Sequence, residues 1–166
     1  MSEILPKVSI ITISYNAAHG IRNTIESVLQ QTYHNIEYII IDGGSTDGTV
    51  EIIREYDSKI TKWISEPDRG ISDAFNKGIN FAGGEFIQFI NAGDILAPDK
   101  IEKSVNLITA HPDCGFVFGD LYLSTQRGTE IVRGNEQYSR TLSYVMDGIN
   151  HPTVLVRKSL FDRYGL

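Results

Sequence analysis

Hydrophobic residues in this chain follow two alternating patterns. Runs at positions 8–13, 36–41 and 86–90 are apolar at nearly every residue and rich in Ile and Val. Such runs are typical of strands that are buried on both faces of a parallel sheet. A shorter run at 62–65 predicts one more strand.

Between these runs the apolar residues are spaced three or four positions apart, which predicts helices. The predicted helices lie near 21–29, 50–56, 72–81 and 98–110. Ser45 and Asp47 are residue types that cap helix N-termini, so both are expected to cap the second helix. The alternation of strand and helix predicts right-handed crossovers and a doubly wound α/β sheet.

The pattern changes after residue 110. Residues 114–124 and 130–133 are expected to form a strand pair, and 149–157 is expected to form one more strand. Cys114 stands at the head of an apolar run and is expected to lie in the core. Because the sequence contains no repeat, low-complexity tract or linker, residues 1–166 are predicted to form a single domain.

Composition and charge narrow the class of protein. The chain has 166 residues, of which 41% are hydrophobic, and this length is sufficient to bury one core. The 21 acidic residues outnumber the 15 Lys and Arg residues, and the net charge of -6 argues against nucleic acid as a partner. No apolar run approaches the roughly 18 residues of a membrane span, and the N-terminal sequence MSEILPK lacks the features of a signal peptide. The chain is therefore expected in the cytoplasm.

Polar residues follow each of the four predicted strands. The four segments are Ser14-Tyr15-Asn16, Asp42-Gly43-Gly44-Ser45, Glu66-Pro67-Asp68-Arg69 and Asn91-Ala92-Gly93-Asp94. The carboxyl ends of parallel strands meet at one edge of a sheet, where open α/β proteins bind their ligands. The same residue types are also common in turns and caps, so a purely structural role stays open for each segment alone.

Several common site motifs are absent from the sequence. It contains no GxGxxG after the first predicted strand, no GxxxxGK[ST] and no GxSxG. The four histidines, His19, His34, His111 and His151, are too scattered to indicate a zinc site. Mg²⁺ or Mn²⁺ often uses one or two protein carboxylates together with phosphate oxygens, and Asp94 is placed for this role.

Four ordered motifs resemble the family 2 glycosyltransferases, which have the GT-A fold. They are VSIITISYN at 8–16, IESVLQQTYHNIEYIIIDGGSTDGT at 25–49, EPDRGISDAFNKGI at 66–79 and FINAGD at 89–94. The resemblance extends over residues 8–166 and is strongest to bacterial enzymes of capsule, O-antigen or colanic-acid-type polysaccharide synthesis. It implies a Rossmann-like, mainly parallel sheet flanked by helices, with a nucleotide-sugar-binding half at 1–97 and the start of an acceptor half at 98–166.

The resemblance also implies a reaction. Such enzymes transfer a sugar from a nucleotide-diphospho-sugar, here expected to be a UDP-sugar, to a saccharide or lipid-linked acceptor. They invert the anomeric centre in a single displacement and usually require Mn²⁺ or Mg²⁺. A peripheral association of the full-length protein with the inner face of the membrane, and a homodimer formed through an exposed strand edge, are further expectations.

The resemblance assigns roles to individual residues. Thr12, Tyr15 and Asn16 are expected beside the nucleotide, with Tyr15 against the base. Asp42 is expected to accept a hydrogen bond from a base N–H, and Arg69 to face the base or the diphosphate. The remaining residues are Asp73 and Asn76 near the donor, Asn91 near the ribose or the metal, and Asp94 as the metal ligand. Simpler alternatives stay open, because Tyr15 would also suit a strand end and Asp73 and Asn76 a solvated helix face.

This chain departs from the family pattern at the acidic motif. Many relatives carry D-x-D, whereas this sequence has Asn91, Gly93 and Asp94. Two adjacent carboxylates repel each other until a metal binds, and a single carboxylate does not. Metal binding is therefore expected to persist and to be weaker when the donor is absent.

The general base of the reaction is expected beyond Leu166. The segment at 161–166 resembles the beginning of a longer family motif, so the chain is expected to be a truncated piece. Within the chain, Asp120 and His151 are candidates for the acceptor side, with Asp147 as a further residue to mutate. Two other functions stay open, namely a module that binds a nucleotide-sugar without transferring it and a sugar-phosphate nucleotidyltransferase. The latter normally has a glycine-rich basic loop, which ISYNAAHG at 13–20 does not provide.

Overall fold

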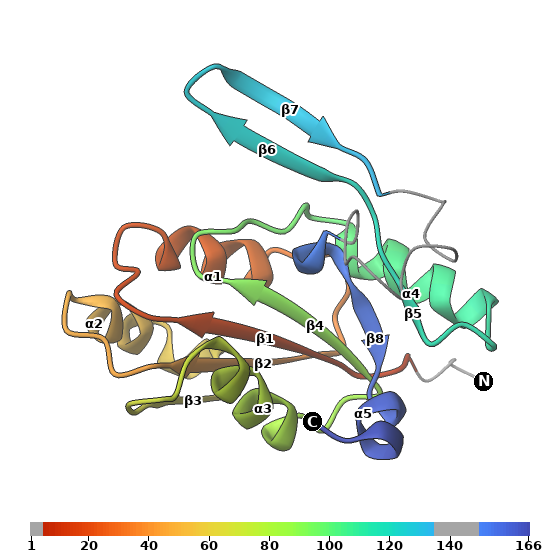
Figure 1. The fold of residues 1–166 in the computed structure, drawn as a ribbon, viewed down its shortest axis with the longest axis horizontal. Helices are drawn as coiled ribbons and strands as arrows, with labels where there is room; N and C mark the ends of the chain where they lie inside the picture. Colours follow the sequence, from red (N-terminus) through yellow and green to blue (C-terminus); the bar gives the residue numbers. More distant parts are fainter. Residues whose placement is uncertain (1–4, 135–149) are drawn as a thin grey trace.

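A six-stranded sheet with the strand order β3-β2-β1-β4-β8-β5 forms the centre of the protein (Figure 1). The computed structural model describes residues 5–134 and 150–166. The strands of this sheet are β1 Val8–Ser14, β2 Ile36–Asp42, β3 Lys62–Ser65, β4 Phe86–Asn91, β5 Phe116–Val117 and β8 Leu155–Arg157. The α-helices are α1 Ile21–Leu29, α2 Thr49–Glu55, α3 Ile71–Phe81, α4 Lys100–Ala110 and α5 Ser159–Tyr164.

The first four strands run parallel, as the sequence pattern predicted. β1 pairs with β2 and β4, and β2 pairs with β3. The register places Ser14 opposite Asp42 and Asp42 opposite Ser65, so the carboxyl ends of three strands are level. β8 runs antiparallel to both β4 and β5, so the sheet is mixed on this side, and β5 is its last strand. The predicted Rossmann-like α/β fold with a mainly parallel sheet is confirmed.

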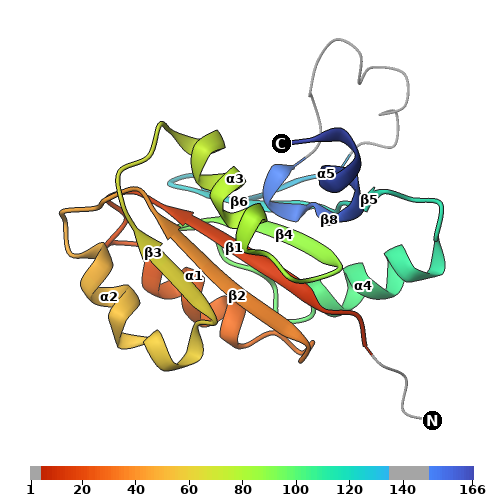
Figure 2. The ribbon, with the colours of Figure 1, turned by 90° about the horizontal axis from the view of Figure 1, so that it is seen from below.

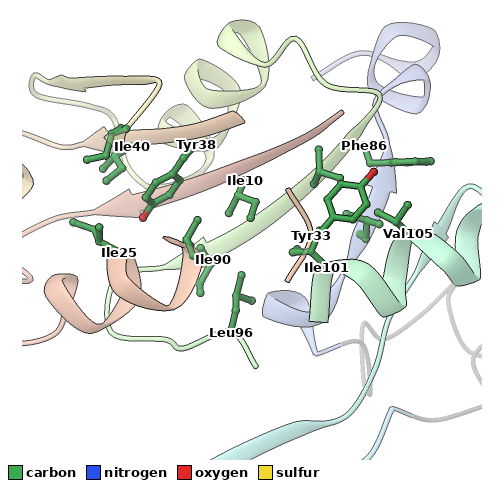
Figure 3. Close-up of a cluster of buried hydrophobic side chains, with 14 of the residues drawn as sticks. Ile10, Ile25, Tyr33, Tyr38, Ile40, Phe86, Ile90, Leu96, Ile101 and Val105 are labelled. Atoms are coloured by element: carbon green, nitrogen blue, oxygen red, sulfur yellow. The ribbon is translucent and has the colours of Figure 1, made fainter. Parts of the chain in front are cut away.

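Helices cover both faces of the sheet, which is why its central strands are apolar at consecutive positions. Figure 2 shows α1, α2 and α4 on one side of the sheet and α3 and α5 on the other. Ile10 faces the first layer, where it belongs to the cluster drawn in Figure 3 together with Ile25 and Ile101. The next residue, Ile11, belongs to the cluster on the opposite face with Ala74 of α3.

Close packing holds α3 against the sheet. A Cβ atom on Gly78 of α3 would lie 2.4 Å from Cγ2 of Ile11, whose side chain is fully buried. Carbon atoms in contact normally lie about 3.5–4.0 Å apart, so a larger residue would separate the helix from β1. α3 and the loop before it are thereby fixed relative to the ends of the strands.

The second half of the chain differs from the sequence prediction in two places. Residues 114–124 form two short strands rather than one, because β5 joins the main sheet and β6 Leu121–Thr125 pairs with β7 Gly128–Val132 in a separate hairpin. This hairpin extends away from the sheet (Figure 1). Within 149–157 only β8 is a strand, and it follows a 3-10 turn at His151–Thr153 that contains Pro152.

The core position predicted for Cys114 is wrong. Its side chain is exposed because the residue lies in the connection between α4 and β5, outside both elements. Its backbone carbonyl accepts a hydrogen bond from Nε of Arg157 at 2.9 Å. Among the described residues, no helix has both the length and the hydropathy needed to cross a bilayer.

Candidate functional site

The carboxyl ends of the parallel strands surround a cavity of about 580 Å³. Its lining includes Tyr15 after β1, Gly43 after β2, Asp68 after β3, and Asn91 and Ala92 at the end of β4. The four polar segments that follow the strands in the sequence therefore do converge on one edge of the sheet. This position corresponds to the ligand-binding crevice of open α/β sheets.

Asp42 organises this edge from inside the protein. Its carboxylate is fully buried. Oδ1 accepts hydrogen bonds from Oγ of Ser14 at 2.9 Å and Oγ of Ser45 at 2.5 Å. Oδ2 accepts hydrogen bonds from Oγ of Ser65 at 2.7 Å and from the backbone N–H groups of Gly44 and Ser45 at 3.1 and 2.9 Å. This arrangement differs from the expectation that Asp42 binds a ligand base, because five donors of the chain itself occupy both oxygens.

Asn16 and Ser45 join the loops that follow β1 and β2. The backbone N–H of Asn16 donates to Oγ of Ser45 at 2.8 Å, and Oδ1 of Asn16 accepts from the N–H of Thr46 at 3.0 Å. Asn16 has a φ of 46°, a left-handed conformation that Asn tolerates better than most residues. Asn16, which was expected beside a ligand, therefore holds the loop after β1. The prediction that Ser45 caps the second helix is wrong, because its hydroxyl donates a hydrogen bond to Asp42.

Asp47 does support the start of α2. Its Oδ1 accepts hydrogen bonds from the N–H and the Oγ1–H of Thr49, the first residue of the helix, at 3.1 and 2.5 Å. Its Oδ2 accepts a hydrogen bond from the N–H of Ala18 at 3.0 Å. The hydrogen bonds from the Thr49 hydroxyl and from Ala18 lower the pKa of Asp47 below its usual value. The predicted N-cap role of Asp47 is wrong, because the N-cap is Gly48, but Asp47 holds the first residue of the helix from the position before the cap.

Tyr15 and Thr12 lie in different surroundings although both belong to the β1 segment. The Tyr15 side chain is 67% exposed and lines the cavity. A Cβ atom on Gly43 would lie 3.3 Å from Cδ2 of Tyr15, so the ring lies beside the end of β2. Thr12 is fully buried, and its hydroxyl shares a 3.0 Å hydrogen bond with the hydroxyl of Tyr38. Thr12 therefore supports the sheet and does not reach the cavity.

Charged residues flank the cavity at the start of α3. The Asp73 carboxylate accepts hydrogen bonds at 3.2 Å from the backbone N–H and from the guanidinium of Arg69. These bonds, the backbone one first, lower the pKa of Asp73 below its usual value. The guanidinium of Arg69 is otherwise open to solvent, since its side chain is 90% exposed. Asn76 is half-buried on the same helix.

The loop after β4 presents Asp94 at the rim. Oδ2 of Asp94 accepts a hydrogen bond from Nδ2 of Asn91 at 3.2 Å. Thr24 of α1 holds the backbone of this loop, because its hydroxyl donates to the Asp94 carbonyl at 2.8 Å and accepts from the Gly93 N–H at 2.9 Å. A Cβ atom on Gly20 would lie 2.8 Å from Cα of Gly93, so α1 and the loop also pack closely. The sequence did not indicate this role of Thr24.

The site fits a divalent cation held by a single protein carboxylate. The described residues contain no group of three or more His, Cys, Asp or Glu side chains that could hold a metal by themselves. Asp94 carries a carboxylate at the rim with Asn91 as a neutral neighbour. Mn²⁺ and Mg²⁺ accept such sites when phosphate oxygens and water complete the coordination.

His151 and Asp120 occupy different places relative to the cavity. The His151 ring packs on Phe89 and Phe75, with centroid distances of 5.9 and 5.1 Å. Burial lowers the pKa of His151, and the charge of Asp94 acts in the opposite direction, so the two side chains are close enough to interact. Asp120 lies beside the hairpin, where its Oδ1 accepts a hydrogen bond from the N–H of Gly134 at 3.0 Å. Asp147 lies outside the described residues.

Asp68 is a charged side chain of the cavity to which the sequence assigned no role. Its segment was recognised as polar and as following a strand, but a turn role suited it equally well. Its carboxylate lines the cavity opposite Tyr15, beside Gly43. The space that Gly43 leaves beside Asp68 depends on how the loops after β2 and β3 pack, which the sequence does not show.

Comparison with known proteins relates this geometry to one family. The sequence model of Glycosyl transferase family 2 matches residues 9–165. The chain is 37% identical over 134 residues to the putative teichuronic acid biosynthesis glycosyltransferase TuaG of Bacillus subtilis, an alignment that covers 79% of this chain and 53% of TuaG. It is also 37% identical over 114 residues to the Escherichia coli UDP-Glc:alpha-D-GlcNAc-diphosphoundecaprenol beta-1,3-glucosyltransferase WfgD, covering 68% of this chain and 45% of WfgD. The chain thus spans about half the length of these relatives.

Solved structures of glycosyltransferases have the same fold. Residues 1–349 of S. aureus TarS in complex with UDP-GlcNAc superpose with a TM-score of 0.77 at 22% identity, covering 95% of this chain and 47% of that one. The mannosyltransferase PcManGT of Pyrobaculum calidifontis, in complex with GDP-Man and Mn²⁺, superposes with a TM-score of 0.75 at 22% identity, covering 98% and 47%. The fold of the chain is therefore the GT-A fold.

Proposed function

Because the chain belongs to Glycosyl transferase family 2, we propose that it binds a nucleotide-diphospho-sugar, most favourably a UDP-sugar, at the carboxyl edge of its sheet. The whole protein would transfer the sugar to a saccharide or lipid-linked acceptor in cell-surface polysaccharide synthesis. Support comes from the names of TuaG and WfgD and from the UDP-GlcNAc complex of TarS. The relatives named above are transferases, so neither a nucleotidyltransferase nor a binding module without activity is favoured.

One observation carries the proposal, namely a cavity lined by the exposed ring of Tyr15 and by Asn91 and Ala92, whose loop carries the Asp94 carboxylate. The Tyr15 ring is exposed and lies beside the end of β2. A base that stacks on such a ring gains about 1–3 kcal/mol. Asp94 lies in the loop after β4, the strand on the other side of β1 from β2, and would face the diphosphate through a cation. A nucleoside diphosphate has these two recognition elements.

We propose Mn²⁺ or Mg²⁺ as the cation, held by Asp94 with Asn91 beside it. The Mn²⁺ in the PcManGT complex supports this choice. When bound, such a cation neutralises negative charge that develops on a leaving diphosphate. Arg69, with its exposed guanidinium, would add a second positive charge at the rim near the donor, and Asp73 would orient it. Asn76 is proposed near the donor on the same helix.

We propose further that the transfer inverts the anomeric centre. The acceptor oxygen would form its bond to the anomeric carbon as the bond from that carbon to the diphosphate oxygen breaks, and a base would remove the acceptor proton. Among the described residues, the His151 ring packs on Phe89 and Phe75 near the charge of Asp94, and burial lowers the pKa of His151, which favours the neutral imidazole that can accept a proton. His151 is therefore the first residue to examine on the acceptor side, and Asp120 is the second.

The name of WfgD includes an acceptor linked to diphosphoundecaprenol. We propose by analogy that the full-length protein works in the cytoplasm at the inner face of the membrane, where it would meet such an acceptor. β5 is the last strand of the sheet and lies open on one side among the described strands. A homodimer formed through this edge is a further proposal, which sedimentation of the chain at several concentrations would test.

The test of donor and metal binding is a thermal-shift titration. Ligands that bind only the folded state stabilise it, by about 2.7 kcal/mol at a concentration of about 100 Kd. UDP and Mn²⁺ together are expected to raise Tm by more than the sum of their separate effects. Equal shifts for the mixture and for either component alone would contradict the proposal.

The variant Asp94→Ala is expected to remove the metal-dependent part of this shift. The loop should persist in the variant, because the backbone bonds to Thr24 hold it. Asp113→Ala is the matched control, since Asp113 is exposed in the connection between α4 and β5. A variant Asp94→Ala that failed to fold would favour a structural role for this carboxylate.

A further inference from the structure

Gly43 leaves a space at the end of β2 that the Asp68 carboxylate fills. A Cβ atom on Gly43 would lie 2.7 Å from Oδ2 of Asp68 and 3.3 Å from Cδ2 of Tyr15. The carboxylate and the aromatic ring therefore flank the same point of the cavity. Gly43 has no left-handed φ, so its backbone does not require glycine. The absence of a side chain at residue 43 is what allows Asp68 to lie there.

The loop that carries Asp68 is fixed on both sides. The N–H of Glu66 donates to the carbonyl of Asp42 at 3.0 Å. A Cβ atom on Gly44 would lie 3.2 Å from N of Pro67, which shows that the loops after β2 and β3 touch. On the other side, Oδ1 of Asp68 accepts a hydrogen bond from the N–H of Gly70 at 2.8 Å. The carboxylate is thus held in one orientation.

The two oxygens of Asp68 differ in their partners. Oδ1 is engaged by Gly70, whereas Oδ2 has no hydrogen-bond or ion-pair partner within residues 5–134 and 150–166. Asp68 is half-buried and lines the cavity. Asp42 lies one residue before Gly43 but is fully buried with both oxygens occupied. Of these two carboxylates, only Asp68 has an oxygen available to a ligand.

We propose that Asp68 is the residue that determines base specificity, with Oδ2 accepting a hydrogen bond from a ring N–H of a base stacked on Tyr15. This inference rests on the proposed binding of a nucleotide-sugar and adds the residue that reads the base. Uracil presents one ring N–H, at N3, which a single free carboxylate oxygen can accept. Cytosine presents a lone pair at N3 and would be repelled by the carboxylate.

Guanine fits this arrangement less well than uracil. It presents two adjacent N–H donors, at N1 and N2, which pair best with both oxygens of a carboxylate. At Asp68 the second oxygen already accepts the Gly70 N–H. The geometry therefore favours a base with a single ring N–H at N3, as in uracil or thymine, over guanine and cytosine.

The variant Asp68→Asn provides a direct test. The Gly70 N–H would retain the amide oxygen as its acceptor, which turns the amide NH₂ toward the base. This NH₂ can donate to N3 of cytosine but meets the N3–H of uracil as a second donor. With Mn²⁺ fixed, titration calorimetry is expected to show UDP affinity lower by about tenfold or more and a preference that shifts toward CDP. Unchanged UDP affinity and preference in this variant would overturn the inference.

A second variant keeps the carboxylate but displaces it. Gly43→Ala would place a Cβ atom 2.7 Å from Oδ2 of Asp68, which is closer than normal contact, so the carboxylate should move, and UDP affinity should fall while Asp68 remains charged. Retention of wild-type UDP affinity in Gly43→Ala would also count against the inference. Asp113→Asn removes the same charge far from the cavity and should bind UDP and CDP as the wild type does.

The wild-type titration separates the two levels of the proposal. If the wild-type chain with Mn²⁺ bound neither UDP nor CDP, the proposed function would fail and the role of Asp68 with it. If the wild type bound UDP and both variants bound it equally well, only the role of Asp68 would fail. A shift of preference from UDP to CDP in Asp68→Asn alone, absent from Asp113→Asn, supports both.

Discussion

Two aspartates at neighbouring strand ends show how surroundings decide the role of a residue. Asp42 is enclosed by five donors of the chain, and Asp68 keeps one oxygen open to the cavity. A buried carboxylate with complete hydrogen bonding stabilises the loops that supply the donors. An accessible carboxylate on a fixed loop can instead select a ligand. In the sequence, Asp42 and Asp68 both follow a predicted strand, so the sequence alone does not distinguish their roles.

Replacement of Asp42 by Asn is expected to destabilise the protein. One side of the amide would present N–H groups to donors such as the Ser65 hydroxyl and the Gly44 N–H, which leaves buried donors unpaired. Each unpaired buried group costs about 1–3 kcal/mol, so a loss of about 3 kcal/mol or more is expected. Urea unfolding of Asp42→Asn beside Asp113→Asn measures it, and a loss below about 0.5 kcal/mol would contradict the structural role.

The elements of the first half were predictable because their burial follows a simple period. Each long strand nevertheless extends one residue beyond its apolar run, to Ser14, Asp42 and Asn91. Ser14 and Asp42 can be buried at these ends because they hydrogen-bond to each other, and hydrophobic periodicity does not show such pairs. In the second half, the predicted strands 114–124 and 149–157 contain β5 and β8, but these have only two and three residues, which is too short for a pattern to define their bounds.

The candidate site was only partly predictable. The convergence of the four strand ends follows from parallel topology, so Tyr15, Asn91 and Asp94 were placed at the correct edge. Thr12 was not, because alternation along β1 gives no sign that its hydroxyl pairs with Tyr38 inside the sheet. Asp68 was missed because its importance depends on the empty space at Gly43, a contact between distant loops.

Packing of α3 on the sheet predicts the effect of Gly78→Ala. Alanine favours a helix by up to about 1 kcal/mol over glycine, but its Cβ would lie 2.4 Å from Ile11. Overpacking of a core typically costs about 1–3 kcal/mol, so a net loss of stability is expected. Urea unfolding would measure it, with Asn80→Ala on the exposed side of α3 as the control. A gain in stability for Gly78→Ala would show that α3 can move outward freely.

Stability of the whole molecule should depend on pH through Lys100. Its ammonium donates to Oε1 of Gln88, and burial lowers the pKa of Lys100 to about 7 from the ordinary lysine value of 10.5. Between these values the unfolded chain binds a proton that the folded chain does not. The free energy of unfolding therefore rises with pH across this interval, by up to about 1.4 kcal/mol per pH unit.

Lys100→Met is the variant that isolates this contribution. It keeps an apolar stem and removes the titrating group, so the rise between pH 7 and pH 10 should be smaller than in the wild type. Urea unfolding at several pH values gives both slopes, and Lys103→Met, on the exposed side of α4, is the control. Equal slopes for Lys100→Met and the wild type would show that Lys100 is hydrated in the folded protein.

The level strand ends have a consequence for how the chain folds. Ser14, Asp42 and Ser65 stand opposite one another on three adjacent strands and share hydrogen bonds through one carboxylate. A slip of one residue between any two of these strands would turn side chains to the opposite face and leave the buried charge without its partners. Misaligned sheets are therefore penalised at the very edge where the cavity forms. A chain that completes folding has, by the same event, assembled the edge that carries the cavity.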